Sequence, residues 1–137
     1  MRKTYVLSII SLLIVIVLSS CSVWKTYPIE LPETDDVVSI SVVSGDRTVS
    51  CIDEVRIENI MFALADMKAT SKASTNDFPA VWNYITINLY CLDNTSKKLF
   101  FYEEHGQEYV EQAYLGIYKP ESSLGVEIRD LLESLDE

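Results

Sequence analysis

Histidine is almost absent from this sequence, and cysteine, glycine and proline are sparse. The 137 residues include one His, three Cys, four Gly and four Pro. The single His105 lies in a turn-forming stretch, EEHG, where the spacing places no convergent partners for acid–base catalysis or metal binding. No glycine-rich run could cradle a phosphate, and no serine is flanked as in a nucleophile elbow. We therefore predict no catalytic residue, no metal site and no cofactor, and a protein that is not an enzyme.

Basic residues are also scarce. Eleven Lys and Arg face 21 Asp and Glu, which gives a formal net charge of −10. Nucleic acid and anionic lipid headgroups repel such a chain, so DNA and RNA binding are excluded. The acidity has two readings, either simple solubility of a surface domain or attraction to a basic partner.

No apolar run is long enough to span a membrane. The longest, residues 5–18, falls short of the ~20 residues that a spanning helix needs. It follows Arg2 and Lys3 and ends in LSSC, residues 18–21. A basic start, a short apolar core and then small residues are typical of an exported signal peptide. The alternative is a buried or membrane helix that ends in Cys by chance.

The LSSC sequence resembles the lipobox of bacterial lipoproteins. The resemblance implies that residues 1–20 are a lipoprotein signal peptide that is removed, and that the Cys21 thiol becomes diacylglycerylated. Two acyl chains suffice for stable anchoring, so the resemblance places the protein on the extracytoplasmic face of the cell membrane. Residues 21–36 would then be the lipidated Cys and a tether, because prolines and acids dominate the segment.

Hydrophobic periodicity predicts one α+β domain over residues 37–137. Val38, Ile40 and Val42 alternate with serines in a first strand, 37–45, and a second follows at 47–51. Asp53 is expected to cap a helix that runs to about Lys68. Strands at 81–92, 97–104 and 107–114 form a meander, with a bend at Leu115-Gly116, before a last helix after Ser123. This order predicts a mainly antiparallel sheet with two helices packed on one face.

Aromatic side chains alternate with aliphatic ones on the strand predicted at 81–92. Trp82, Tyr84 and Tyr90 would share one face, and Tyr102 and Tyr114 would extend the row from neighbouring strands. Aromatics with a polar tip are enriched at interfaces, so this face is a candidate binding surface. The alternative is a second, smaller core, because aromatic pairs also stabilise sheets outright.

Two cysteines remain in the predicted domain, Cys51 and Cys91, each near the end of a predicted strand. Export would permit a disulfide between them. The alternative is two buried, unpaired thiols that act as small apolar side chains. Spacing alone leaves both readings open.

Glu111 and Gln112 stand side by side within the stretch YVEQAYLGIY, residues 109–118. Because neighbours on a strand point to opposite faces, one of them must point toward the helices and needs a hydrogen-bond partner. We expect Gln112 or Glu111 to bind backbone in the loop that contains Asn76 and Asp77. The stretch would then be a structural clasp first and a binding site second.

This stretch and NDFPAVWNYI, residues 76–85, resemble a family of small bacterial lipoproteins that share an extracytoplasmic domain of unknown function. The matching residues are Asn76, Asp77, Pro79, Asn83, Tyr84 and Ile85, and then Tyr109, Glu111, Gln112, Tyr114, Gly116, Ile117 and Tyr118. Ala113 stands where the family usually has Pro. The resemblance implies the domain type and the location, and no activity.

Together these features predict a membrane-anchored extracytoplasmic lipoprotein with a non-catalytic binding module. Its lipid would contact the membrane, and the aromatic face and closing motif would contact an unknown protein, peptide or envelope component. A second hypothesis is an inhibitor or immunity-type protein that neutralises a basic toxin or enzyme.

Overall fold

A seven-stranded sheet carries two helices in the computed structural model, which describes residues 26–121 and 124–134. The strands are β1 (Val37–Ser44), β2 (Arg47–Cys51), β3 (Lys68–Ala69), β4 (Ile85–Cys91), β5 (Ser96–Glu104), β6 (Gln107–Gln112) and β7 (Gly116–Lys119). The helices are α2 (Glu54–Ala65) and α3 (Leu124–Glu133), and a 3-10 turn, η1 (Thr34–Asp36), precedes β1.

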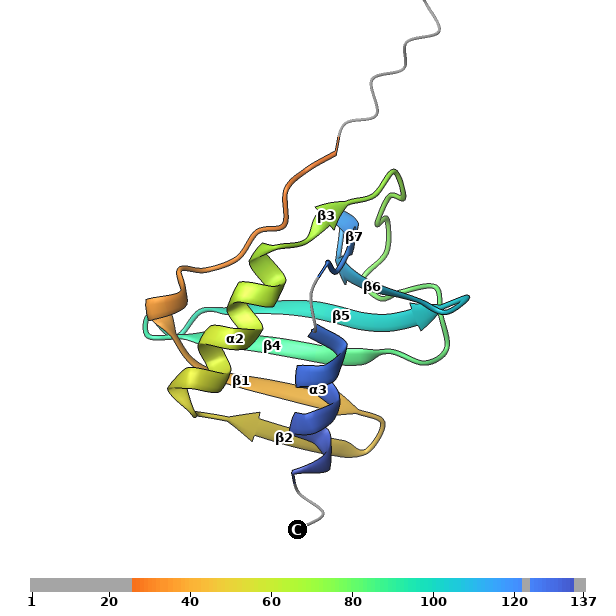
Figure 1. The fold of residues 1–137 in the computed structure, drawn as a ribbon. Coiled ribbons are helices and arrows are strands. Elements are labelled where there is room, and N and C mark those ends of the chain that lie inside the picture. Colours follow the sequence, from red (N-terminus) through yellow and green to blue (C-terminus); the bar gives the residue numbers. More distant parts are fainter. Residues whose placement is uncertain (1–25, 122–123, 135–137) are drawn as a thin grey trace, which may run out of the picture.

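The sheet is antiparallel throughout, with strand order β2-β1-β4-β5-β6-β7-β3. Both helices lie on the same side of it, α2 and α3 side by side across β1, β2 and β4 (Figure 1). This arrangement confirms the predicted α+β class and the two helices on one face. The opposite side of the sheet is called the back face below.

The main core lies between the helices and the sheet. Its fully buried side chains come from alternate strand positions and from one side of each helix, among them Ile40, Val42, Ile60, Leu64, Ile87, Leu89, Leu99, Leu124 and Ile128. Alternation places these strand residues on the helix side because successive side chains point to opposite faces.

The first strand departs from simple alternation at its start. Ile40 and Val42 are buried as predicted, but Val38 is 44% exposed and Val37 is buried instead. The pairing of β1 with β4 shifts register between Val37 and Ser39. Such a bulge inserts one extra residue and turns the side chains before it to the other face, so the prediction for Val38 is wrong.

Helix α2 begins where the sequence predicts and ends earlier. Asp53 caps it, since its carboxylate accepts a hydrogen bond of 2.9 Å from the Arg56 N–H. The helix ends at Ala65, and Lys68 pairs with Lys119 in the short edge strand β3. The sheet therefore takes Lys68, which helical periodicity assigned to the helix.

Strand β7 was missed as well. A turn follows Gln112, closed by a 3.0 Å hydrogen bond from the Leu115 N–H to the Gln112 carbonyl. Tyr114 adopts a positive φ of 61° there, which a tyrosine seldom does. The chain reverses through this turn, and the bend predicted at Leu115-Gly116 is in fact the start of another strand.

The segment predicted as a free tether lies against the domain from Tyr27 onward, so that part of the prediction is wrong. Residues 27–33 are called the strap here. Its apolar side chains, Ile29 and Leu31, pack on the main core. The Tyr27 carbonyl accepts a hydrogen bond of 3.0 Å from the Tyr118 hydroxyl. Buried apolar area and satisfied backbone groups hold the strap down in spite of its acids. Residues 1–25, with the predicted signal peptide and Cys21, lie outside the described part of the chain.

Cys51 and Cys91 are both buried and unpaired. Cys51 stands opposite Ile40 on one side of β1, whereas Cys91 stands opposite Val37 on the other side. One strand therefore separates them, a span of about 9–10 Å, which exceeds the ~7 Å between Cα atoms that a disulfide allows. The reading as buried thiols is confirmed.

In the ranges that the structure covers, no helix is long and apolar enough to cross a membrane.

Candidate functional site

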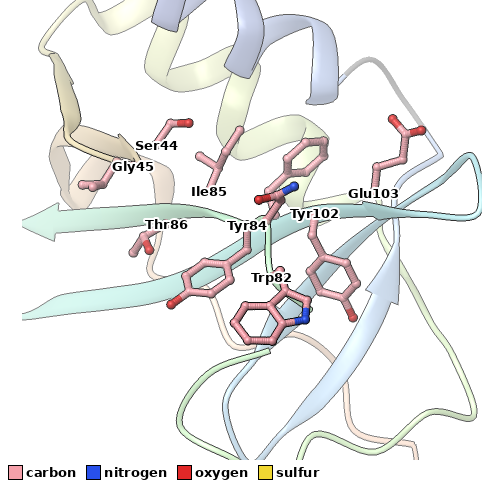
Figure 2. A pocket seen from close by; sticks show the side chains of 11 residues that line it. Ser44, Gly45, Trp82, Tyr84, Ile85, Thr86, Tyr102 and Glu103 are labelled. Carbon is pink, nitrogen blue, oxygen red and sulfur yellow. The ribbon is translucent and has the colours of Figure 1, made fainter. Parts of the chain in front are cut away.

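An open hollow of about 730 Å³ lies where β4 begins. The first residue of β4 is Ile85, which pairs with Phe101, yet β5 continues past Phe101 to Glu104. The β1–β2 turn at Gly45 bounds the hollow on its other side. Beyond Ile85, no β4 residue fills the place between β1 and the end of β5, and this place is the hollow. Figure 2 shows the side chains around it.

Trp82 stands at the rim of this hollow, and its side chain is 100% exposed. In Figure 2 its indole lies on the same side of the sheet as the rings of Tyr84 and Tyr102, whereas Ile85 points to the other side. The prediction that Trp82 belongs to a strand is wrong, because β4 begins only at Ile85. A large exposed indole next to a concave surface is the main candidate for a contact residue.

Tyr84 forms the wall of the hollow and is fixed by a small second core. Its ring meets Phe100 edge-on at a centroid distance of 5.3 Å, and Phe78 lies 6.5 Å from it. Phe100 is buried on the back face of β5, under the loop of residues 70–84. The predicted alternative of a second core is therefore confirmed for these rings.

Tyr102 belongs to the same second core. It is 5% exposed, its ring lies 5.7 Å from that of Tyr109, and its hydroxyl is 3.5 Å from Oε2 of Glu111. Burial, followed by the nearby carboxylates of Glu111 and Glu104, raises the pKa of the Tyr102 phenol. The phenol therefore stays protonated, and Tyr102 contributes the inner wall of the hollow instead of a free contact.

Tyr90 and Tyr114 do not extend the row. Tyr90 is 42% exposed but lies near the opposite end of β4 from the hollow. Tyr114 is 65% exposed in the turn before β7. A hydrogen bond to Asp77, with some burial, raises the pKa of its phenol. The predicted continuous aromatic face is wrong, because β4 is shorter than its periodicity suggests and the 70–84 loop covers part of the row.

Glu111 anchors the loop that covers the back face. Its carboxylate is 5% exposed, and Oε1 accepts a hydrogen bond of 2.7 Å from the Ser74 hydroxyl. The Ser74 oxygen in turn accepts one of 3.2 Å from the Tyr114 N–H. Lys72 reinforces the loop, with its ammonium 4.4 Å above the Tyr109 ring. The Glu111 partner is thus a side chain of this loop, and the predicted backbone partner at Asn76-Asp77 is wrong.

Gln112 points to the helix side and holds the strap. Its Oε1 accepts a hydrogen bond of 2.9 Å from the Glu30 N–H, and its Nε2 donates one of 3.0 Å to the Glu30 carbonyl. Tyr118, on the same side, binds Tyr27. Glu111 and Gln112 therefore clasp two different segments on opposite faces. Sequence reasoning found both residues but missed Ser74 and Glu30.

The described residues offer no group of three or more His, Cys, Asp or Glu that could hold a metal ion. His105 is exposed in the turn between β5 and β6, with a positive φ of 53°. The chemistry that the hollow presents is therefore an aromatic rim, a polar sheet end and the exposed carboxylate of Glu103. Such a surface is suited to non-covalent binding.

Comparison with known proteins identifies the domain. The family model DUF5301, described as a domain of unknown function (DUF5300), matches residues 25–119. The chain belongs to this family. Its boundaries include the strap and end with β7, so the strap is part of the DUF5301 domain. The domain of unknown function implied by the sequence resemblance is thereby confirmed at the level of the family.

A solved structure shares the fold. It is described as "NMR structure of the protein from Ruminococcus gnavus", and it is 31% identical in sequence with a TM-score of 0.62. The match covers 72% of this chain and 97% of that one. No curated protein matches the chain.

Proposed function

We propose that this DUF5301 protein is a membrane-anchored extracytoplasmic lipoprotein, and that its domain is a non-catalytic module that binds a protein or peptide through the hollow beside Trp82. The complete exposure of Trp82 carries the proposal. Tryptophan is among the residues that contribute most binding energy when an interface buries them. Its exposure to water is unfavourable because the indole is largely apolar.

The magnitudes favour a contact role for this side chain. An aromatic residue buries ~200 Å² at an interface. At ~25 cal/mol per Å², that area corresponds to about 5 kcal/mol of gross hydrophobic gain, before the costs of association are subtracted. Tyr84, held by Phe100 and Phe78, would supply a rigid surface beside the indole. Rigid anchors lose little conformational entropy on binding.

Photo-crosslinking on the cell surface tests the binding site. The chain with a photoreactive residue at Ser44, which lines the hollow, is compared with the same chain carrying Trp82→Ala or Tyr90→Ala. Tyr90 is the matched control, since it is an exposed aromatic away from the hollow. We expect Trp82→Ala to abolish the crosslinked species and Tyr90→Ala to preserve it. The same crosslinks from all three chains would remove the hollow from consideration.

The sequence before the described residues supports the anchoring. A basic start and a short apolar core precede LSSC, and the strap begins six residues after Cys21. Metabolic labelling with a radioactive fatty acid, in cells that express the chain or its Cys21→Ser variant, tests this part. We expect label in the chain and none in the variant. An unlabelled chain, or equal label in the variant, would exclude lipidation at Cys21.

The charge distribution favours a second candidate, an inhibitor or immunity-type protein for a basic toxin or enzyme. Glu103 lines the hollow and Asp46 is exposed in the adjacent turn. Opposite charges steer association, and salt screens them. This candidate predicts a partner that loses activity when bound and an association rate that falls steeply with ionic strength. A salt-independent rate would favour the simple binding module.

A further inference from the structure

We propose that the edge of the sheet formed by β7 and β3, together with the strap, is the surface that faces the lipid bilayer. The proposal rests on the lipid anchoring proposed above and adds an orientation to it. It follows from where the strap is fixed, how short the chain before it is, and which side chains stand at that edge.

The strap fixes the start of the domain at this edge. The Tyr27 carbonyl accepts its hydrogen bond from Tyr118, which is 1% exposed and lies on β7. Three residues later, Glu30 is held by both polar atoms of the Gln112 side chain. In Figure 1 the coloured start of the strap lies toward the end of the sheet where β3 and β7 are labelled, far from β2. An anchor upstream of Tyr27 therefore pulls on this end of the sheet.

The chain before Tyr27 is short compared with the sheet. Tyr27 is six positions after Cys21. Fully extended, these six steps span at most ~22 Å. The seven strands, with a spacing of ~4.8 Å, place β2 roughly 29 Å from β3 along the sheet. A leash of this length keeps β7 and β3 close to the headgroups and leaves β2 as the far side.

The side chains at this edge suit a zwitterionic headgroup region, because Asp66 and Glu121 stand beside its lysines and the two signs of charge balance. Lys68 and Lys119 stand opposite each other in the β3–β7 register, and both are exposed. Lys68 pairs with Glu121, while no acid pairs with Lys119 among the described residues. Tyr27 is 51% exposed and lines a hollow together with Ala69 of β3 and Tyr118 of β7. Tyrosine and lysine are enriched at membrane interfaces, where an amphipathic ring or a long cationic chain reaches the headgroups.

The orientation also leaves the hollow accessible. The hollow lies at the β4 position, between β1 and β5, and thus several strands away from β7 and β3. Trp82 would face the space beside or beyond the domain and not the bilayer.

Energy transfer to the membrane surface tests the orientation in vitro. The chain from Cys21 onward, with Cys51→Ala and Cys91→Ala, is coupled through Cys21 to a maleimide lipid in phosphatidylcholine vesicles that contain a dansyl-headgroup lipid. Trp24→Phe and Trp82→Phe remove the native donors. One variant then carries Ala69→Trp on β3, and its matched control carries Thr48→Trp on β2; both positions are exposed.

We expect transfer from position 69 to be several-fold stronger than from position 48. Adding Gln112→Ala and Tyr118→Phe should release the strap, lengthen the leash and reduce this difference. Equal transfer from both positions, or stronger transfer from position 48, would overturn the proposal. If a tryptophan variant does not fold, hydrogen exchange of the coupled chain gives the same decision. Vesicle attachment is then expected to slow amide exchange at residues 68–69 and to leave exchange at residues 47–51 unchanged. Slowing at 47–51 without slowing at 68–69 would contradict the orientation.

Failure of the orientation and failure of the anchoring are distinguishable. Coupling to the maleimide lipid is chemical, so the vesicle result does not depend on lipidation in cells. Fatty-acid labelling of the chain and of its Cys21→Ser variant tests lipidation alone.

Discussion

The side-chain amide of Gln112 forms two hydrogen bonds with the backbone of Glu30, 82 residues earlier in the chain. One amide oxygen and one amide nitrogen thus satisfy a backbone donor and a backbone acceptor, as a neighbouring strand would. Gln112 is 7% exposed, so water cannot easily replace either bond. This contact makes the strap part of the folded domain.

We therefore predict that Gln112→Ala releases the strap. Loss of two largely buried hydrogen bonds, and of the packing of Ile29 and Leu31, should lower the free energy of unfolding by about 1–3 kcal/mol. Urea denaturation measures this change, and limited proteolysis should show faster cleavage within residues 27–33. Gln107→Ala is the control, because its amide bonds only the adjacent Glu108 carbonyl. Equal destabilisation by both variants would contradict the role of the strap.

A double-mutant cycle tests the contact between Ser74 and Glu111. Because the two side chains are buried and 2.7 Å apart, Ser74→Ala and Glu111→Gln should be strongly non-additive. Contacting residues typically couple by about 0.5–3 kcal/mol, and we expect a value in this range from denaturation of the four chains. The pair Lys72→Ala and Glu104→Gln, an exposed ion pair in the same region, is the comparison and should couple less. A coupling near zero for Ser74 and Glu111 would show that the loop is held elsewhere.

Alkaline pH should destabilise the domain through its buried tyrosines. Burial and neighbouring carboxylates raise the pKa of Tyr102, and burial followed by Glu30 raises that of Tyr118. The folded state therefore keeps protons that the unfolded state releases near pH ~10, and stability falls as pH rises through that value. Denaturation at about pH 8 and about pH 11 should show this loss, reduced in Tyr102→Phe. An unchanged loss in Tyr102→Phe, equal to that of Tyr90→Phe, would refute the assignment.

Stability should distinguish the two aromatic residues that sit on either side of Tyr84. Phe100 is 2% exposed, so Phe100→Ala should cost about 3–5 kcal/mol of unfolding free energy. Trp82 is fully exposed, so Trp82→Ala should change it by less than about 0.5 kcal/mol. Thermal denaturation measures both. A large loss in Trp82→Ala would mean that the indole supports the fold, and its role as a contact residue would lose its basis.

Long periodic elements could be predicted from the sequence because their signal is local. The alternation from Ile85 to Cys91 and the three- and four-residue steps of α2 each repeat over several residues. Asp53 was recognisable as a cap because it precedes an apolar-periodic segment. The alternation of Glu111 and Gln112 also predicted correctly that they serve opposite faces, one toward the helices.

The remaining elements depend on contacts between distant segments. Strand β3 has two residues, which is too few for any period, and it exists because β7 offers an edge. Strand β7 follows a turn in which a tyrosine takes a positive φ, where a glycine would have been the usual signal. The strap reads as a linker because prolines and acids outnumber Ile29 and Leu31, although the spacing of these two by two residues was a usable sign. Partners such as Ser74 and Glu30 become apparent only after folding.

The position of β1 between Cys51 and Cys91 has a consequence for how the protein can mature. Neither of these two thiols can reach the other without removing a central strand, so the fold of residues 26–121 and 124–134 needs no disulfide between them. We therefore expect a change of redox conditions to leave the stability that these two residues contribute unchanged.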